Sequence, residues 1–384
     1  MHNHDSLSST DRMSLLDKVR MINGGFVALV VLLGLIGTGM LYSAGGSDWQ
    51  PWAWPQMTRF FAGLVLMLAM ALVDIRVWLR IAYPFYIFVF GLLIFVAVMG
   101  HVGMGAQRWM RFGFLGIQPS ELMKIALVMA LARYFHGLEI EQIKKPLRLV
   151  APSLLVLAPV GLVLLQPNLG TAILLVFASL AIFFVAGVQW WKFAAVFALA
   201  ALILPLGWHY YLHDYQKARL MTFMDPMADP LGTGYNILQS QIALGSGGLW
   251  GKGFAMGTQS QLQFLPEKHT DFIFVVLAEE FGLSGALLLL LLYFLVLCYG
   301  FMIALTSRSR FSRLCAFGLT TTIFLYVFVN VAMVTGLIPV VGIPLPLISY
   351  GGSAMMTLLL ACGLLLSLSV HRNIRISRTG NIDF

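Results

Sequence analysis

The sequence predicts an all-α membrane protein: a polytopic bundle of about ten transmembrane helices with one long, structured loop outside the membrane. Hydrophobic residues make up 59% of the 384 residues and charged residues only 10%, and the mean hydropathy is +0.87. Soluble domains carry about 25% charged residues, so a chain this apolar has lipid as its solvent. The apolar residues also fall in separate runs, each long enough to cross about 30 Å of hydrocarbon.

Ten of these runs are expected to be transmembrane helices. They are residues 24–43, 57–75, 82–100, 120–136, 149–166, 170–188, 193–210, 284–305, 314–337 and 353–370. The stretch Phe272–Phe281 is too short to span alone and leads into Gly282 and Gly285, so we expect a half-helix or a bend before the eighth span. Residues 1–22 are polar and have no apolar core, which is unlike a signal peptide. The expected organisation is an N-terminal tail 1–22, a membrane domain 23–372 and a C-terminal tail 373–384.

Lysine and arginine indicate the orientation in the membrane. With the N-terminus inside, sixteen of the 24 fall on the cytoplasmic side, seven fall outside, and Lys124 lies within a span. The sixteen are Arg12, Lys18, Arg20, Arg76, Arg80, Arg133, Lys144, Lys145, Arg148, Lys192, Arg308, Arg310, Arg313, Arg372, Arg375 and Arg378. Because cytoplasmic loops carry the excess of basic residues, we expect both termini in the cytoplasm. The same bias makes a nucleic-acid partner unnecessary as an explanation of the net charge of +8.

The longest polar segment, residues 211–271, then lies on the outer face. It carries several charged residues of both signs and seven glycines between Gly232 and Gly253. Glycine-rich backbone can bring its N–H groups close to an anion. A solvated loop without a ligand is the plain alternative.

Ionisable residues within or near the spans are the next feature. Glu121 and Lys124 are three residues apart on one expected helix, within reach of one another, and Glu279 and Glu280 precede the eighth span. Charges at membrane depth are costly and often mark a functional cavity. A structural ion pair explains Glu121 and Lys124 equally well, and an interfacial position explains the two glutamates. The three cysteines, Cys298, Cys315 and Cys362, have no metal-like spacing and are interpreted as core residues.

Five motifs occur in an order that resembles one family. They are GAQRWMRFGFLGIQPSELMK (105–124), QPNLGTA (166–172), DPLGTGYNILQSQIALGSGGLWGKG (229–253), FLPEKHTDFIF (264–274) and GLIPVVGIPLPLISYGGS (336–353). The chain resembles the shape, elongation, division and sporulation (SEDS) family over about residues 20–372, and the elongation branch more than the division branch. Asn168 departs from the family pattern, where an acidic residue is common, so this position is not expected to be catalytic.

The resemblance implies a peptidoglycan glycosyltransferase of the bacterial inner membrane. Such an enzyme polymerises lipid II, a disaccharide-pentapeptide on undecaprenyl diphosphate, into glycan strands on the outer face during cell elongation and shape maintenance. The implied partners are a class B penicillin-binding protein, which is a transpeptidase, and other elongation-complex membrane proteins. No organic cofactor is expected; a divalent cation, Mg²⁺ or Mn²⁺, could share the diphosphate with one carboxylate, although the sequence has no dedicated metal motif.

Glycosyl transfer from a diphosphate needs a base for the attacking hydroxyl and cations for the leaving group. Asp271 ends the outer loop at the bilayer surface, and the family motif favours it as the catalytic residue; the alternative is an N-cap of the following helix. Candidate substrate-binding residues are Lys268, Glu121, Lys124, Arg108, Arg219, Lys252 and Ser349, and Arg111 is a further candidate cation. The proline-rich last motif cannot be a regular helix and is expected to form a re-entrant or capping segment near Asp271.

Two other functions fit the composition. A transporter that flips lipid II would also need kinked spans and buried charges, although the polar groups crowd the outer side and no duplicated halves are evident. A scaffold that only positions other cell-wall proteins would have no need for Asp271.

Overall fold

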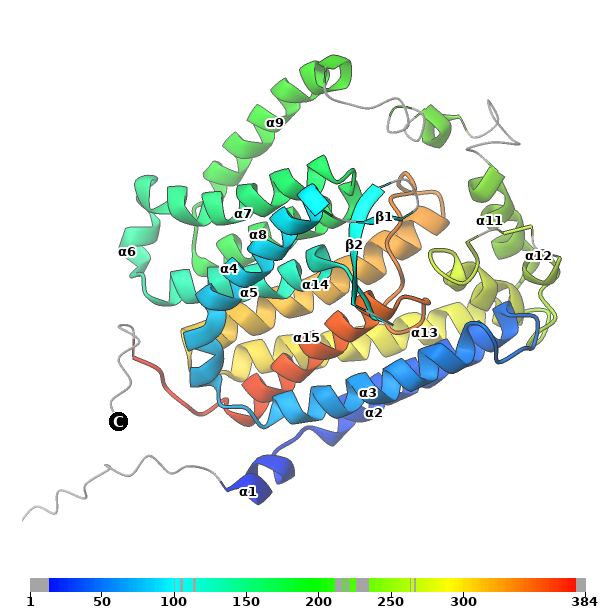
Figure 1. Ribbon diagram of the computed structural model, residues 1–384, viewed down its shortest axis with the longest axis horizontal. Coiled ribbons are helices and arrows are strands. Elements are labelled where there is room, and N and C mark those ends of the chain that lie inside the picture. The colour runs from blue at the N-terminus through cyan, green and yellow to red at the C-terminus, as the bar shows by residue number, and fades with distance from the viewer. Residues whose placement is uncertain are drawn as a thin grey trace, which may run out of the picture.

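The computed structural model describes residues 14–99, 101–103, 106–112, 115–210, 217, 221–225, 235–262, 264, 265 and 267–377 (Figure 1). The described elements are, in order, α1 (Leu15–Arg20), α2 (Gly24–Ala44), α3 (Ala53–Ala71), α4 (Ile75–Met99), β1 (His101–Gly103), β2 (Ala106–Phe112), β3 (Leu115–Ile117), α5 (Pro119–His136), α6 (Ile140–Ile143), α7 (Leu147–Leu165), α8 (Leu169–Ala186), α9 (Trp190–Tyr210), α11 (Tyr235–Ser246), α12 (Thr258–Gln261), α13 (Ile273–Thr306), α14 (Arg310–Val334) and α15 (Gly352–Val370).

The ten predicted spans all coincide with helices. Within the described part of the chain, seven helices are long and apolar enough to cross a membrane: α2, α4, α7, α8, α13, α14 and α15. The three other predicted runs form α3, α5 and α9, of 19, 18 and 21 residues. Glu121, Lys124 and Arg133 make α5 less apolar than its neighbours. The predicted class, a polytopic helical membrane protein, is therefore confirmed.

A small sheet between α4 and α5 was not predicted. Strands β1, β2 and β3 pair antiparallel in that order, with Trp109 opposite His101 and Met110 opposite Ile117. The prediction placed only a loop between the third and fourth spans. Two of the strands have three residues each, which is too short for an alternating pattern to stand out in the sequence.

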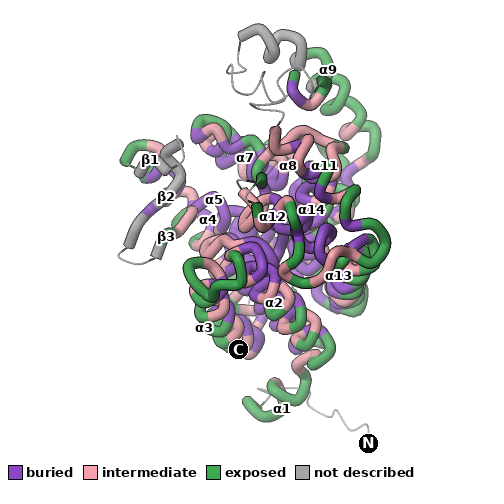
Figure 2. The backbone as a smooth tube through the Cα atoms, turned by 90° about the vertical axis from the view of Figure 1, so that its right-hand side faces the viewer, coloured by how far each residue is buried: buried purple, intermediate pink, exposed green. Residues whose placement is uncertain are grey.

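Small residues allow the central helices to approach closely. A side chain at Gly63 of α3 would collide with Leu359 of α15, and one at Gly363 of α15 would lie 2.8 Å from the carbonyl oxygen of Met67. Without a hydrophobic driving force between helices in lipid, such close packing is a main source of association. Figure 2 shows the result, with buried residues gathered in the centre of the bundle and exposed ones on α9 and α1.

Helix α13 is broken at Gly282, which has φ +66° and ψ −164°. The first part, Ile273–Phe281, is the half-helix that the sequence predicted. The turn formed by residues 247–253, which we call the clasp, covers the break: the N–H groups of Lys252 and Gly253 donate to the carbonyls of Glu279 and Glu280. In return, the N–H groups of Leu283 and Ser284 donate to the carbonyls of Gly248 and Leu249. The broken helix therefore leaves none of these backbone groups unpaired in an apolar setting.

The loops predicted to be cytoplasmic meet at one end of the bundle. Figure 1 shows α1, α6 and the C-terminal segment at this end and α11 and α12 at the other. Backbone and side-chain bonds join its loops: Arg308 N–H donates to the carbonyl of Arg372, Arg310 to the carbonyls of Leu138 and Ala186, and Lys192 to that of Lys144. The predicted inner loops are thus neighbours in space.

Candidate functional site

Asp271 lies in the turn formed by residues 267–272, directly before the half-helix. The cap position of α13 is Phe272, and no side chain makes a capping hydrogen bond there. Asp271 is partly exposed, and a side chain at Gly342 would lie 3.3 Å from its Oδ2 atom. The carboxylate therefore stands one residue outside the position that an N-cap occupies.

The proline-rich last motif packs against this turn and forms hydrogen bonds to it. It enters the bundle as a non-helical segment in which residues 345–349 are buried. The Ser349 hydroxyl donates to the carbonyl of Thr270 at 2.5 Å, and the Tyr350 N–H donates to the carbonyl of His269 at 2.8 Å. Asn330 of α14 donates to the carbonyls of Asp271 and Ile343 at 2.9 and 2.7 Å. The predicted re-entrant segment and its contact with the Asp271 neighbourhood are both present.

The beginning of α3 and the residue before it form the other side of the site. Trp52 stacks on the His269 ring with centroids 4.0 Å apart, and Arg59 donates to the Tyr350 hydroxyl at 3.0 Å. None of Trp52, Gln56, Arg59 and Asn330 was predicted from the sequence as a site residue; Gln56 donates to the Ser349 carbonyl at 3.1 Å. Asn330 could have been found as a lone amide in an apolar span, since such a group needs partners in lipid.

Two basic side chains lie in the Asp271 turn itself. The Lys268 ammonium donates to the carbonyl of Ser260 at 2.5 Å, and burial lowers the pKa of Lys268. Burial also lowers the pKa of His269, an effect that the Glu267 carboxylate opposes and the Lys268 cation reinforces. Lys268 keeps its place as a candidate cation beside Asp271.

Glu121 and Lys124 form an internal pair rather than a free ligand-binding pair. The Lys124 ammonium lies 2.6 Å from Glu121 Oε1, and the two residues are 5% and 3% exposed. The Tyr326 hydroxyl of α14 donates to Glu121 Oε2 at 2.6 Å and also contacts Lys124. These bonds join α5 to α14, so the structure favours the structural ion pair over the substrate-binding role.

Ser349 and Lys252 are also occupied by contacts within the protein. The Ser349 hydroxyl donates to Thr270 and accepts from the Leu345 N–H, and the residue is buried. The Lys252 ammonium pairs with the buried Glu279 carboxylate at 2.7 Å. The hydroxyl of Ser349 thus anchors a loop, and Lys252 neutralises a carboxylate.

The remaining candidates are placed as follows. Arg108 and Arg111 lie in β2, and Arg219 lies outside the described residues. Asn168 is the N-cap of α8, and its side chain accepts from the Thr171 N–H. Several glycines of the outer loop lie in the clasp. The N–H groups of Lys252 and Gly253 there donate to backbone carbonyls of α13.

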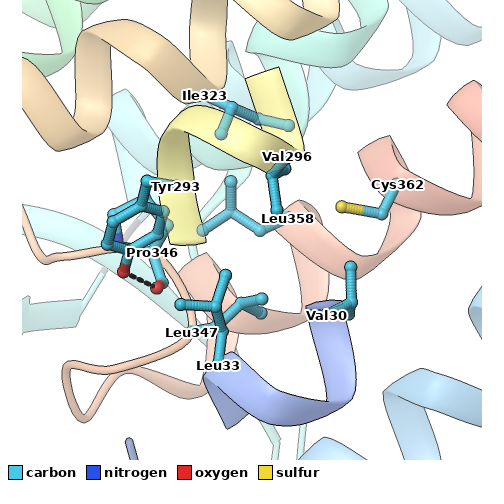
Figure 3. A pocket seen from close by; sticks show the side chains of 9 residues that line it. All are labelled: Val30, Leu33, Tyr293, Val296, Ile323, Pro346, Leu347, Leu358 and Cys362. Atoms are coloured by element: carbon cyan, nitrogen blue, oxygen red, sulfur yellow. Dashed lines mark hydrogen bonds between the residues drawn. The ribbon is translucent and has the colours of Figure 1, made fainter. Parts of the chain in front are cut away.

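Two apolar spaces lie in the bundle. A small one of about 10 Å³ is lined by Tyr293, Pro346, Leu347 and six other residues, and Figure 3 shows the Tyr293 hydroxyl bonded to the Pro346 carbonyl beside it. A larger groove of about 400 Å³ lies between α8, α9 and α14 and is lined largely by phenylalanines, including Phe177, Phe184, Phe193 and Phe324. The first is too small for a ligand; the second has the size and polarity of a site for an apolar chain.

The bundle and the partly exposed carboxylate held by a re-entrant segment define a polytopic membrane protein with a polar site at one end. The chain belongs to the FtsW/RodA/SpoVE family, whose model, described as "cell cycle protein", matches residues 23–374.

Relatives cover most of the chain. Peptidoglycan glycosyltransferase MrdB of Escherichia coli is 44% identical over 90% of this chain and 93% of its own length. A probable peptidoglycan glycosyltransferase FtsW of Geobacter metallireducens is 37% identical over 80% and 82%. Among solved structures, a chain of a peptidoglycan synthase complex matches with a TM-score of 0.80 and 33% identity, covering 92% of this chain and 98% of that one. The rod shape determining protein RodA of Thermus thermophilus matches with a TM-score of 0.69 and 31% identity, covering 92% and 98%.

Proposed function

We propose that this protein is a peptidoglycan glycosyltransferase that polymerises lipid II on the outer face of the bacterial inner membrane during cell elongation. The observation that carries the proposal is the 44% identity to the E. coli glycosyltransferase MrdB over nearly the full length of both chains. The position of Asp271 is consistent with it: the residue is partly exposed, and its own carbonyl and that of Thr270 accept hydrogen bonds from Asn330 and Ser349.

In this reaction Asp271 is the general base. Its carboxylate takes the proton from the attacking sugar hydroxyl while the bond between the anomeric carbon and the diphosphate oxygen breaks. The oxygen of the attacking sugar forms the new glycosidic bond, and the diphosphate leaves on its lipid. A positioned base contributes about 10²–10⁴ in rate.

Cations near the turn stabilise the leaving diphosphate. Lys268 is three residues before Asp271, and among the described residues its ammonium bonds to one group, the carbonyl of Ser260. Arg59, which the structure brings beside Tyr350, has no carboxylate within ion-pair distance among the described residues. A divalent cation held by the diphosphate and one carboxylate would add charge to the same place, since Mg²⁺ favours such mixed sites.

The apolar parts of the substrate need an apolar surface. The phenylalanine-lined groove between α8, α9 and α14 offers one within the membrane region. We further propose that both termini are cytoplasmic and that a class B penicillin-binding protein cross-links the strands. The solved peptidoglycan synthase complex, which coordinates polymerization and crosslinking, contains a chain similar to this one and supports such a partnership.

The test is to incubate the purified protein with lipid II, alone and with its transpeptidase partner, and to resolve the products on a gel. Glycan strands are the expected product. A lipid II flippase or a scaffold would give none under any condition, even with the partner present. Transfer of labelled lipid II between the leaflets of proteoliposomes, measured in parallel, would identify the flippase.

A further inference from the structure

Glu279 is a completely buried residue whose carboxylate accepts several hydrogen bonds. Its Oε1 atom accepts from the Lys252 ammonium at 2.7 Å and from the Gln259 N–H at 2.9 Å, and Thr258 Oγ1 lies 3.2 Å away. Its Oε2 atom accepts from the Ser260 N–H at 3.3 Å. The residue is 0% exposed. A carboxylate with this many donors, one of them a cation, is held in one place.

These contacts form a closed path to Asp271. Glu279 holds the N–H of Ser260, and the carbonyl of Ser260 accepts from the Lys268 ammonium at 2.5 Å. Lys268 lies in the Asp271 turn, and the half-helix Ile273–Phe281 leads from that turn back to Glu279. The carboxylate of Glu279 therefore connects the far end of the half-helix to the beginning of the turn.

The break at Gly282 makes this connection necessary. A continuous helix would fix the direction of the half-helix through its own hydrogen bonds, but at Gly282 these bonds are replaced by bonds to the clasp. The backbone bonds of Lys252 and Gly253 attach the clasp to the helix end, and the Lys252 side chain attaches it to Glu279. A side chain at Gly257 would lie 2.8 Å from Glu279 Oε2, so the loop backbone passes directly against the carboxylate.

We infer that the ion pair of Glu279 and Lys252 is the positioning pair of the active site: it sets where Asp271 and Lys268 stand without touching the substrate. This rests on the proposed function, in which Asp271 is the base. Lys252, which the sequence suggested as a substrate ligand, acts through Glu279. A displacement of about 1 Å at the reacting groups can cost about 10²-fold in rate.

The neighbouring glutamate supplies a matched control. Glu280 is equally buried at 1% exposure, but its carboxylate accepts from the Ser43 hydroxyl of α2 and from the Ala255 backbone. Among the described residues, its side chain makes no hydrogen bond to Lys252 or to α12. Replacing its carboxylate with an amide in Glu280→Gln therefore removes no bond along the path to Asp271.

The experiment compares Glu279→Gln, Glu280→Gln, Lys252→Met and Lys252→Arg in purified, full-length protein with lipid II, well below the thermal midpoint of each variant. We expect Glu279→Gln and Lys252→Met to lower kcat about 10- to 100-fold with less than about threefold change in KM. Lys252→Arg should retain most of the rate, and Glu280→Gln should match the wild type. Equal losses in Glu279→Gln and Glu280→Gln, or wild-type kcat per folded molecule in Glu279→Gln, would overturn the inference.

A second measurement does not depend on turnover. Hydrogen exchange of the backbone amides in residues 267–272 should become faster in Glu279→Gln and stay unchanged in Glu280→Gln, because only the first releases the turn. If the wild type makes no strands from lipid II while this difference in exchange is observed, the proposed function fails and the positioning pair stands. If strands form and the exchange of the two variants is the same, the positioning pair fails alone.

Discussion

At the scale of single residues, the contacts around Asp271 hold its backbone in place without using its carboxylate. Its backbone carbonyl is bonded to Asn330, and the carbonyls before it are bonded to Ser349 and Tyr350. The backbone of the turn is thus held by neighbours that do not use the carboxylate, and the cap position belongs to Phe272. The side chain can therefore be changed with little effect on the position of the turn.

Asp271→Asn should abolish strand synthesis and leave folding intact. An amide has nearly the size of the carboxylate but cannot take the proton of the attacking hydroxyl, so the loss should be at least about 10²–10⁴-fold. Lipid II polymerisation on gels measures the effect, with the thermal midpoint as the control for folding. Asp271→Glu should also be strongly impaired, because its carboxylate is displaced by one methylene. Full-length strands from the Asn variant would exclude Asp271 as the base.

His269 should make stability depend on pH. Its pKa in the folded protein is lowered from 6.5, chiefly by burial, so the unfolded chain binds a proton more readily. The contribution of neutral His269 to the free energy of unfolding is fully present above pH 6.5. It is lost as the pH falls from 6.5 through the lower pKa of the folded state. Thermal unfolding in detergent between pH 5 and 8 should show a falling midpoint on the acid side, and His269→Gln should flatten this slope. An unchanged slope in the variant would assign the pH dependence to other groups.

The sequence identified Asp271 and Lys268 because they lie in one short motif at the end of a loop. It could not identify Trp52 and Arg59, which are more than 200 positions away and reach the turn only through the packing of α3. It also could not show that Glu121, Lys124 and Ser349 are already bonded within the protein, because their partners, Tyr326, Thr270 and Leu345, come from other elements or from the backbone. Residue types indicate which groups could do chemistry, and only the tertiary contacts show which are already used.

At the scale of elements, α13 depends on one glycine. Gly282 has a backbone conformation that side chains rarely adopt, and an added side chain would collide with the backbone of Leu249 and Gly251. Gly282→Ala should cost about 1–3 kcal/mol of stability and should reduce activity, because the half-helix is redirected. Thermal unfolding and strand synthesis measure the two effects. Gly91→Ala in α4, where an added side chain meets nothing within 4 Å, is the control and should unfold like the wild type.

The pair of Glu121 and Lys124 should matter for folding. Lys124→Met leaves the buried Glu121 carboxylate with the Tyr326 hydroxyl as its side-chain partner among the described residues, which costs about 3–5 kcal/mol for a broken buried pair. Adding Glu121→Gln should restore much of the thermal midpoint, because the buried charge is then removed. A Lys124→Met protein with a wild-type midpoint but no strand synthesis would return the pair to the active site.

The elements themselves were largely predictable. Runs of apolar residues located the ten long helices with ends that differ by at most seven residues, α13 being counted from its break at Gly282, and the glycines after Phe281 indicated the bend. The three-stranded sheet was missed because its strands are short and because the sequence does not show which residues pair across them. The clasp was missed for a different reason: its glycines indicate a permissive backbone, and the partner of that backbone is not evident from the sequence.

At the scale of the whole molecule, the bias in basic residues predicts which end of the bundle is cytoplasmic. A cysteine at Met224 in the outer loop, where the side chain is 81% exposed, should react with an impermeant maleimide added to intact spheroplasts. A cysteine at the exposed Arg308 should react only after lysis. Cys298, which is partly exposed, is replaced by alanine in both. The opposite pattern would place Asp271 on the cytoplasmic side and contradict an external polymerase.

The order of the chain bears on how the protein is made. The clasp precedes Gly282 by about thirty residues, so the ribosome completes it before the break in α13 is synthesised, and chains emerge N-terminal part first. Once α13 is made, the carbonyls of Glu279 and Glu280 and the N–H groups of Leu283 and Ser284 can pair with a segment that was synthesised before them. A helix that would be a poor membrane span by itself therefore has its partner available from the start.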